Sequence, residues 1–268
     1  LADRQALMPA MPFDVAFCDT CIGGSSVATQ LARPGLRAFY LADYGVNPLG
    51  TRTDVEVQAA LERWVEIGAA RAPVVIIACN TASARLVDAP AVRHRAQGLH
   101  VNVISMVDLL DQVLARHSVS GESVCLMGTE YTVNSPVYAD RIAAAGAAEV
   151  VRLGATETER SVASLQHETA AGRELIRDEI GDAVRNSSTV VLACTCFPLI
   201  SDLLGELNPH AKLLDPGVEI RDVVDWPERE GPSHLVIAFT GDSITPSKRQ
   251  VQALFPGWDE IEIVNLAD

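Results

Sequence analysis

The sequence predicts an α/β fold of mostly parallel strands flanked by helices. Short apolar runs recur along the chain, helical patterns lie between them, and two of the runs end in similar cysteine motifs. Continuous apolar runs are typical of strands covered on both faces, and their alternation with helices favours parallel pairing through right-handed crossovers. A length of 268 residues allows either two lobes or one large α/β unit.

Six apolar runs are expected to form the buried strands. Each run ends in a small or polar cluster, and ligand chemistry gathers at the carboxyl ends of strands in such sheets. The expected strands are Val15–Cys18, Val74–Ala78, Val101–Ile104, Val124–Met127, Val190–Ala193 and Val236–Phe239.

The clearest expected helix spans residues 53–71. Thr53 and Glu56 have the spacing of a capping box, in which each residue bonds the other's backbone amide. Apolar and small residues then recur at helical spacing on one face. These residues are Val57, Leu61, Trp64 and Gly68.

The segment Ala155–Glu174 is rich in acidic residues. Such a run is typical of the solvated face of a helix. A lid over a site and a contact between subunits are the alternative interpretations.

Composition and charge exclude several classes of function. The formal net charge of -14 repels phosphate backbones, so we expect no nucleic-acid partner. No apolar stretch approaches the eighteen or so residues of a membrane span. Residues 1–12 lack the pattern of an export signal, so we expect a cytoplasmic location. The six cysteines are therefore expected to be reduced thiols.

Two segments form a weak internal repeat. Residues 74–81 read VVIIACNT and residues 190–196 read VVLACTC, so each apolar strand delivers Ala-Cys and then small hydrogen-bonding residues. If the copies belong to related lobes, Cys79 and Cys194 reach opposite sides of one bound molecule. A lone buried cysteine is more often a small hydrophobe, which is our interpretation of Cys125.

Two facing thiols suit a reaction that removes a proton from one face of a carbon atom and returns one to the other face. The inversion of an amino acid at Cα is such a reaction. One thiol must be ionised while the other is protonated, and the ordinary cysteine pKa of about 8.5 is close enough to neutrality for the surroundings to adjust it. We expect the helix start after each strand to stabilise a thiolate.

A carbanion formed at Cα needs hydrogen-bond donors aimed at the substrate carboxylate. Pyridoxal phosphate would normally need a Schiff-base lysine, and lysines are few in this chain, so we expect a route without a cofactor. The expected donors follow apolar strands: Asn80, Thr81, Thr129 and Thr195.

Several motifs resemble, in order, those of the glutamate racemase family within the aspartate/glutamate racemase superfamily. The resemblance extends from about Asp14 to the C-terminus. The motifs are DTCIGG at 19–24, NPLG at 47–50, ACNTAS at 78–83, GT at 128–129 followed by Thr132, Ser135 and Tyr138, ACTCFPL at 193–199, DPG at 215–217 and TGD at 240–242.

This resemblance implies two pseudo-symmetric α/β lobes with an active site in the cleft between them. Residues 1–104 plus about 216–268 would form the lobe that carries Cys79, and residues from about 105 to 215 the lobe that carries Cys194. These two thiols would deprotonate opposite enantiomers of glutamate, with Asp19 assisting Cys79. The residues that would bind substrate are Thr20, Leu49, Gly50, Asn80, Thr81, Thr129, Thr195 and Cys196.

The resemblance also implies a cofactor-independent isomerase that supplies D-glutamate for peptidoglycan, with a homodimer as the common assembly. Three residues depart from the family pattern: Cys196 replaces a histidine, Leu49 a tyrosine and Cys21 a glycine. Loss of the imidazole predicts more unequal rates in the two directions. Leu49 predicts a reshaped pocket.

Other functions remain open from the residues alone. A racemase, isomerase or decarboxylase for another amino acid or carboxylic acid would share this fold, and a non-catalytic binding homologue is a further alternative. Asp19 could serve only as a helix cap or turn residue. Cys18 and Cys21 have the spacing of a metal half-site, but Cys194 and Cys196 are an unusual partner and no suitable histidine lies beside either pair, so we expect no metal.

Overall fold

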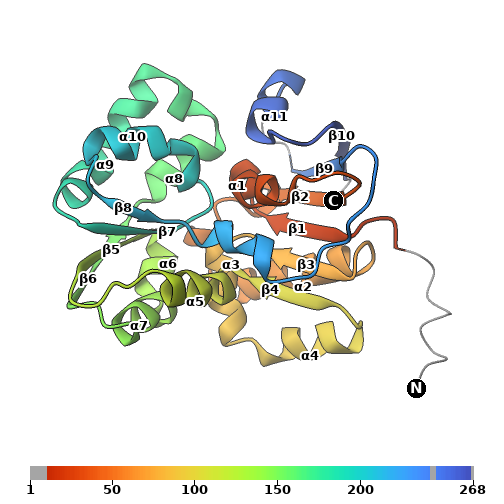
Figure 1. Ribbon diagram of the computed structural model, residues 1–268, viewed down its shortest axis with the longest axis horizontal. Helices are drawn as coiled ribbons and strands as arrows, with labels where there is room; N and C mark the ends of the chain where they lie inside the picture. Colours follow the sequence, from red (N-terminus) through yellow and green to blue (C-terminus); the bar gives the residue numbers. More distant parts are fainter. Residues whose placement is uncertain (1–10, 242–245, 267–268) are drawn as a thin grey trace.

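Two parallel sheets, each flanked by helices, make up the computed structural model of the protein (Figure 1). It describes residues 11–241 and 246–266. Most of the segment tested for an export signal, and Asp242 of the TGD motif, lie outside the described residues. Within the described residues, no helix combines the length and apolar character that crossing a membrane requires.

The first sheet has the strand order β10-β9-β2-β1-β3-β4, and every neighbouring pair is parallel. Its central strand β1 is completely buried and pairs with β2 on one side and β3 on the other. The strands are β1 Val15–Asp19, β2 Arg37–Asp43, β3 Val74–Ile77, β4 Asn102–Ser105, β9 His234–Thr240 and β10 Glu260–Asn265.

Helices cover both faces of this sheet because side chains alternate along each strand. Ala16 and Cys18 face a core that includes Trp64 of α2, whereas Val15 and Phe17 face a second core with α11. The flanking helices are α1 Ser25–Ala28, α2 Asp54–Ala69, α3 Asn80–Val87, α4 Pro90–Gly98, α5 Met106–Arg116 and α11 Lys248–Leu254.

The second sheet has the order β6-β5-β7-β8, again with parallel pairs only. Its strands are β5 Ser123–Gly128, β6 Glu149–Gly154, β7 Thr189–Ala193 and β8 Lys212–Leu214. The helices are α6 Glu130–Asn134, α7 Pro136–Ala144, α8 Thr156–Ala163, α9 Ala170–Arg185 and α10 Ser201–Leu207. Cys125 of β5 is buried in the core beneath α8 and α9, as its interpretation as a small hydrophobe requires.

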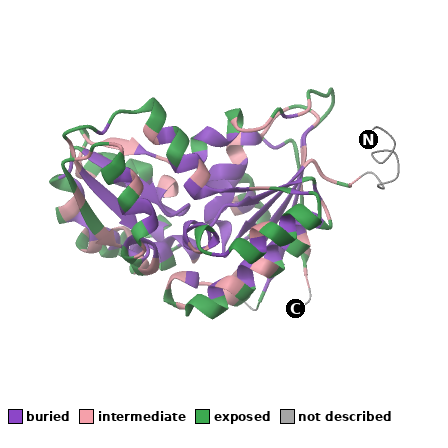
Figure 2. Ribbon diagram, turned by 90° about the horizontal axis from the view of Figure 1, so that it is seen from below, coloured by how far each residue is buried: buried purple, intermediate pink, exposed green. Residues whose placement is uncertain are grey.

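Short 3₁₀ helices connect these elements. They lie at Ile22–Gly24, Thr29–Leu31, Tyr44–Val46, Leu49–Thr51, Gln166–Glu168, Phe197–Ile200 and Pro216–Asp222. Figure 2 shows that buried residues concentrate on the strands, while the outer faces of the helices are exposed.

All six expected strands are present, with ends that shift by one or two residues. The expected helix at 53–71 corresponds to α2, and Thr53 and Glu56 form the expected capping box, with a 2.8 Å bond from the Thr53 amide to the Glu56 carboxylate. Four strands, β2, β6, β8 and β10, were not expected. Three of them have no long apolar run: β6 and β10 are partly buried edge strands, and β8 has only three residues.

The two sheets take their strands from residues 15–105 with 234–265, and from residues 123–214. The proposed lobe boundaries, after residue 104 and near residue 216, stay a prediction of the sequence. In Figure 1 the chain passes from the first sheet to the second through α5 and returns through the 3₁₀ helix at 216–222.

Candidate active site

A cavity lies where the carboxyl ends of β1 and β3 meet those of β5 and β7. About 310 Å³ of space free of protein atoms, part of it open to solvent, lies among its lining residues. Every residue that the sequence predicted to be catalytic or substrate-binding lines this cavity. Three residues outside that prediction complete the lining: Cys21, Glu159 and Ala193.

Cys79 and Cys194 enter the cavity from different sheets. Cys79 lies between the end of β3 and the start of α3, and Cys194 directly follows β7. Only 7% and 8% of their surfaces are exposed. The same local sequence, an apolar strand followed by Ala-Cys, therefore delivers one thiol from each sheet to a shared space.

Burial dominates the environment of Cys79. It raises the pKa of this thiol well above the ordinary value, the Asp19 charge raises it further, and only the backbone amide of Ala82 opposes these effects. We expected the start of α3 to favour the thiolate. That contribution exists but is the smaller one, so Cys79 needs a nearby base to lose its proton.

Asp19 ends β1 and is 1% exposed. One of its carboxylate oxygens accepts a 2.7 Å hydrogen bond from the Thr20 amide, and the other accepts a 2.8 Å bond from the hydroxyl of Thr195 in the second sheet's motif. Burial raises its pKa to about 6 even though these hydrogen bonds lower it. Cys21, rather than Asp19, caps the following 3₁₀ helix, so Asp19 is not a helix cap.

Asn80 supplies an unpaired donor at the cavity. The Tyr138 hydroxyl donates a 2.8 Å hydrogen bond to Asn80 Oδ1, which orients the side-chain amide. Among the described residues, the buried Asn80 Nδ2 has no hydrogen-bond partner. A buried amide without an acceptor is costly, and a bound carboxylate would satisfy it.

Three threonine hydroxyls join the two halves of the cavity. Thr81 of α3, Thr129 and Thr132 lie 3.0 to 3.1 Å from one another, oxygen to oxygen. Gly50 packs against this cluster, since a Cβ placed on it would lie 2.7 Å from Thr129 Cβ. The loop that carries Leu49 and Gly50 therefore packs closely against Thr129, which follows β5 of the second sheet.

Glu159 is a site residue that the sequence analysis missed. It lies on α8, within the acidic segment interpreted as a solvated helix face, but it is 4% exposed and lines the cavity. Burial, followed by the Asp19 charge, raises its pKa to about 8. The solvated-face interpretation holds for Glu157 and fails for Glu159, which lies two positions further along the helix.

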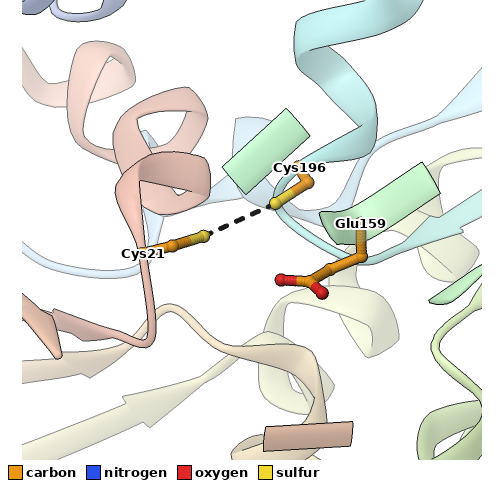
Figure 3. A group of neighbouring side chains, drawn as sticks. All are labelled: Cys21, Glu159 and Cys196. Atoms are coloured by element: carbon orange, nitrogen blue, oxygen red, sulfur yellow. Dashed lines mark hydrogen bonds between the residues drawn. The ribbon is translucent and has the colours of Figure 1, made fainter. Parts of the chain in front are cut away.

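Cys18 and Cys21 are close in the sequence but do not lie together in the structure. Cys18 points away from Cys21, into the core with Trp64, and its thiol donates to the Trp64 carbonyl. Instead, Cys21 and Cys196 meet across the two sheets with their sulfur atoms 3.6 Å apart (Figure 3). Gly23 makes this approach possible, because a Cβ there would lie 2.6 Å from Cys196 Sγ.

Two of the motifs lie outside the cavity. Asp215 caps the 3₁₀ helix at 216–222 and accepts a 2.8 Å hydrogen bond from the Gly217 amide. Thr240 donates to the buried carboxylate of Asp43, which also accepts a bond from the Trp64 indole. These motif residues support the fold around the site rather than its lining.

Comparison with known sequences identifies relatives of the chain. The sequence model of the Asp/Glu/hydantoin racemase family matches residues 47–224. A glutamate racemase of Pectobacterium carotovorum is 33% identical over 232 residues, which are 82% of this chain and 77% of that protein. The chain belongs to the glutamate racemase family. It is accordingly an isomerase of the racemase class.

Solved glutamate racemase structures share the fold. A structure from Bacillus anthracis superposes with a TM-score of 0.75 at 18% identity, covering 95% of this chain and 97% of that one. The Escherichia coli structure, in complex with L-glutamate and the activator UDP-MurNAc-Ala, has a TM-score of 0.70 at 22% identity, covering 95% and 99%. The α/β architecture with two parallel sheets is thereby confirmed.

Proposed function

We propose that this racemase interconverts L- and D-glutamate without a cofactor, by proton transfer between Cα and the two thiols Cys79 and Cys194. The observation that carries the proposal is that equivalent strand ends of two sheets deliver these thiols to one cavity. A ligand held between them presents one face of Cα to each thiol.

In each direction, the thiolate of one cysteine takes the Cα proton, and the other cysteine gives its proton to the opposite face. The exchanged protons leave the cysteines with their ionisation states reversed, ready for the reverse reaction. Because burial disfavours the Cys79 thiolate, Asp19 is the proposed acceptor of its thiol proton. With a pKa of about 6, Asp19 is largely ionised at neutral pH.

The carbanion would be stabilised through the substrate carboxylate, which gains enolate character. The free amide of Asn80 and the hydroxyls of Thr81 and Thr129 are the proposed donors. Asp19 and Glu159 are the carboxylates of the cavity lining that can accept hydrogen bonds from the substrate ammonium group.

Glutamate is the proposed substrate because curated relatives above 30% identity are glutamate racemases, and the E. coli structure was solved with L-glutamate. Leu49, Cys196 and Cys21 all line the cavity, so the three departures from the family pattern bear directly on the ligand.

Cys196 is expected to make the two directions unequal. Hydrogen bonds with Cys194 and Cys21, together with burial, hold the pKa of Cys196 well above its ordinary value. This thiol therefore stays protonated near neutrality and cannot replace an imidazole as a base. The Glu159 carboxyl, which α8 brings to the cavity beside Cys196, has a pKa of about 8 and is therefore mostly protonated near neutrality, so it is a poorer proton acceptor than Asp19.

The proposed setting is the bacterial cytoplasm, with D-glutamate destined for peptidoglycan. All six cysteines are described and free, which fits a reducing compartment. A homodimer is the proposed assembly, following the resemblance, and sedimentation of the purified chain would test it.

The decisive experiment incubates the protein with L- and D-glutamate in deuterated water and follows exchange at Cα together with optical rotation. Wild-type protein is expected to exchange and invert both enantiomers. Cys79→Ser and Cys194→Ser should each abolish inversion, because a serine hydroxyl is far less acidic than a thiol. Cys125→Ser, a buried thiol outside the cavity, is the matched control.

Binding of glutamate without exchange would indicate a non-catalytic homologue. Absence of both exchange and binding would contradict glutamate as the substrate and direct the same assay to other amino acids. Inversion that survives in either cysteine variant would contradict the two-thiol mechanism, whereas exchange of one enantiomer without inversion is what the remaining thiol can still catalyse.

A further inference from the structure

Three buried metal-binding side chains meet at one side of the cavity. Cys21 follows β1, Cys196 follows β7, and Glu159 lies on α8, so three separate elements each bring one side chain. One ligand atom from each lies within 4.8 Å of the other two, and all three residues are buried (Figure 3).

The separation of the two sulfur atoms fits a tetrahedral metal ion. Zinc binds thiolates at about 2.3 Å, which places two sulfurs of a regular tetrahedron about 3.8 Å apart. Cys21 Sγ and Cys196 Sγ are 3.6 Å apart. A cation between them would need only a small adjustment of these side chains.

Glu159 provides a second, independent observation. Its Oε2 atom is buried and has no hydrogen-bond partner among the described residues, and its carboxylate points toward the space beside the two thiols (Figure 3). A substrate ammonium group would explain a carboxylate in the cavity. It would not explain two thiols held 3.6 Å apart next to that carboxylate.

We propose that Cys21, Cys196 and Glu159 form a binding site for a thiophilic divalent cation such as Zn²⁺, with a fourth position open to the cavity. Two sulfurs and one carboxylate are a ligand set that zinc accepts. From the sequence we predicted no metal site, because we considered only pairs of cysteines that are close in the sequence. The proposed site uses one cysteine from each pair.

Such a cation would inhibit the enzyme rather than assist it. All three ligands line the cavity that holds the proposed catalytic thiols, so a bound ion takes space and hydrogen-bonding groups from the substrate. Binding must also displace the thiol protons, because thiolates are the ligands. Affinity is therefore expected to increase with pH.

The test titrates tag-free, fully reduced wild-type protein with Co²⁺, which reports thiolate ligation by its near-ultraviolet charge-transfer band and tetrahedral geometry by its visible bands. We expect saturation at one Co²⁺ per chain and displacement of both bands by Zn²⁺. Cys21→Ser and Cys196→Ser should each lose about half of the charge-transfer intensity per bound ion and weaken binding at least tenfold. Glu159→Gln should keep the charge-transfer band and bind more weakly.

The controls separate this site from the other thiols of the protein. Cys125→Ser should leave the titration unchanged, since this thiol lies outside the cavity. Cys79→Ser should retain the charge-transfer band. A band that disappears with Cys79→Ser and persists with Cys21→Ser would place the cation between the catalytic thiols and overturn the proposal.

X-ray absorption of the wild-type zinc complex does not depend on any variant folding. Two sulfur neighbours and the remainder oxygen or nitrogen are expected, and a shell without sulfur or with four sulfurs would overturn the site. Stoichiometric Zn²⁺ should also block the exchange reaction until a chelator removes it. That last readout rests on the proposed racemase activity, whereas the spectra do not; bound Zn²⁺ with undiminished exchange would refute the placement in the cavity.

Discussion

At the scale of the residue, Asp19 shows how opposing effects set the chemistry of the site. Burial raises its pKa, and the hydrogen bonds from Thr195 and Thr20 lower it, with a result of about 6. The carboxyl group is thus mostly ionised at neutral pH, which is only about one pH unit above its pKa. A small change in its hydrogen bonds should change the pH range of activity.

Thr195→Val tests this balance. The Thr195 hydroxyl donates to the ionised carboxylate of Asp19 at 2.8 Å, so its removal favours the protonated form and raises the Asp19 pKa. The acid limb of the kcat/KM profile should move upward from about pH 6 by about one pH unit, because a hydrogen bond to a charged group contributes about 1.5 kcal/mol or more.

Thr189→Val is the matched control for that profile. Thr189 is a buried threonine at the other end of β7 whose hydroxyl also donates to a carboxylate, that of Glu122. Its removal should leave the acid limb in place. An unchanged limb in Thr195→Val would mean that Asp19 is not the base whose ionisation limits the reaction.

At the scale of the element, the 3₁₀ helix Leu49–Thr51 is positioned by contact with the start of α6. Gly50 has no positive φ, so its backbone would accept any residue. The constraint is steric, because a Cβ would lie 2.7 Å from Thr129 Cβ and 2.8 Å from its hydroxyl oxygen. Glycine at residue 50 therefore leaves the space that Thr129 of the threonine cluster occupies.

Gly50→Ala should disturb that cluster. Overpacking at such a contact typically costs about 1 to 3 kcal/mol of folding free energy, and displacement of Thr129 should raise KM more than it lowers kcat. Gly205→Ala in α10 is the control, because a Cβ there meets no atom within 4 Å and alanine favours a helix. Equal kinetic parameters in Gly50→Ala and wild type would show that this contact does not position the substrate.

At the scale of the whole molecule, buried acids make the stability depend on pH. The folded pKa of Glu159 is about 8, compared with an ordinary value of 4.5. Between these values the unfolded chain has released the proton while the folded chain retains it, so stability falls as pH rises. Asp19 adds the same trend between 3.8 and about 6.

Glu159→Gln should remove the larger part of this dependence. Each pH unit inside the window costs the wild type about 1.4 kcal/mol at most, so the variant should become progressively more stable than wild type from about pH 5 to 8. Urea unfolding in the presence of a chelator, at several pH values, measures the difference. Glu174→Gln, at an exposed position of α9, should track the wild type, and parallel curves for both variants would contradict the burial of a protonated Glu159.

Local patterns in the sequence were sufficient to predict the strand ends that carry the residues of the site. The expected strands that end at Cys18, Ala78, Met127 and Ala193 are apolar runs followed by small or polar residues, and the carboxyl ends of parallel strands meet at one edge of a sheet. This regularity explains why Cys79 and Cys194 were found as a pair.

The sequence by itself determined which elements form and which side chains stand at their ends, since hydrophobic periodicity and turn chemistry act over a few residues. Only the tertiary structure decided the partners of those side chains across the two sheets. The bond from Thr195 to Asp19 and the meeting of Cys21 with Cys196 join residues more than 170 positions apart. Glu159 belongs to the same category, because it lies one turn before the buried Val162 and Ala163 of α8, and only the tertiary structure decided that this face of the helix lines the cavity.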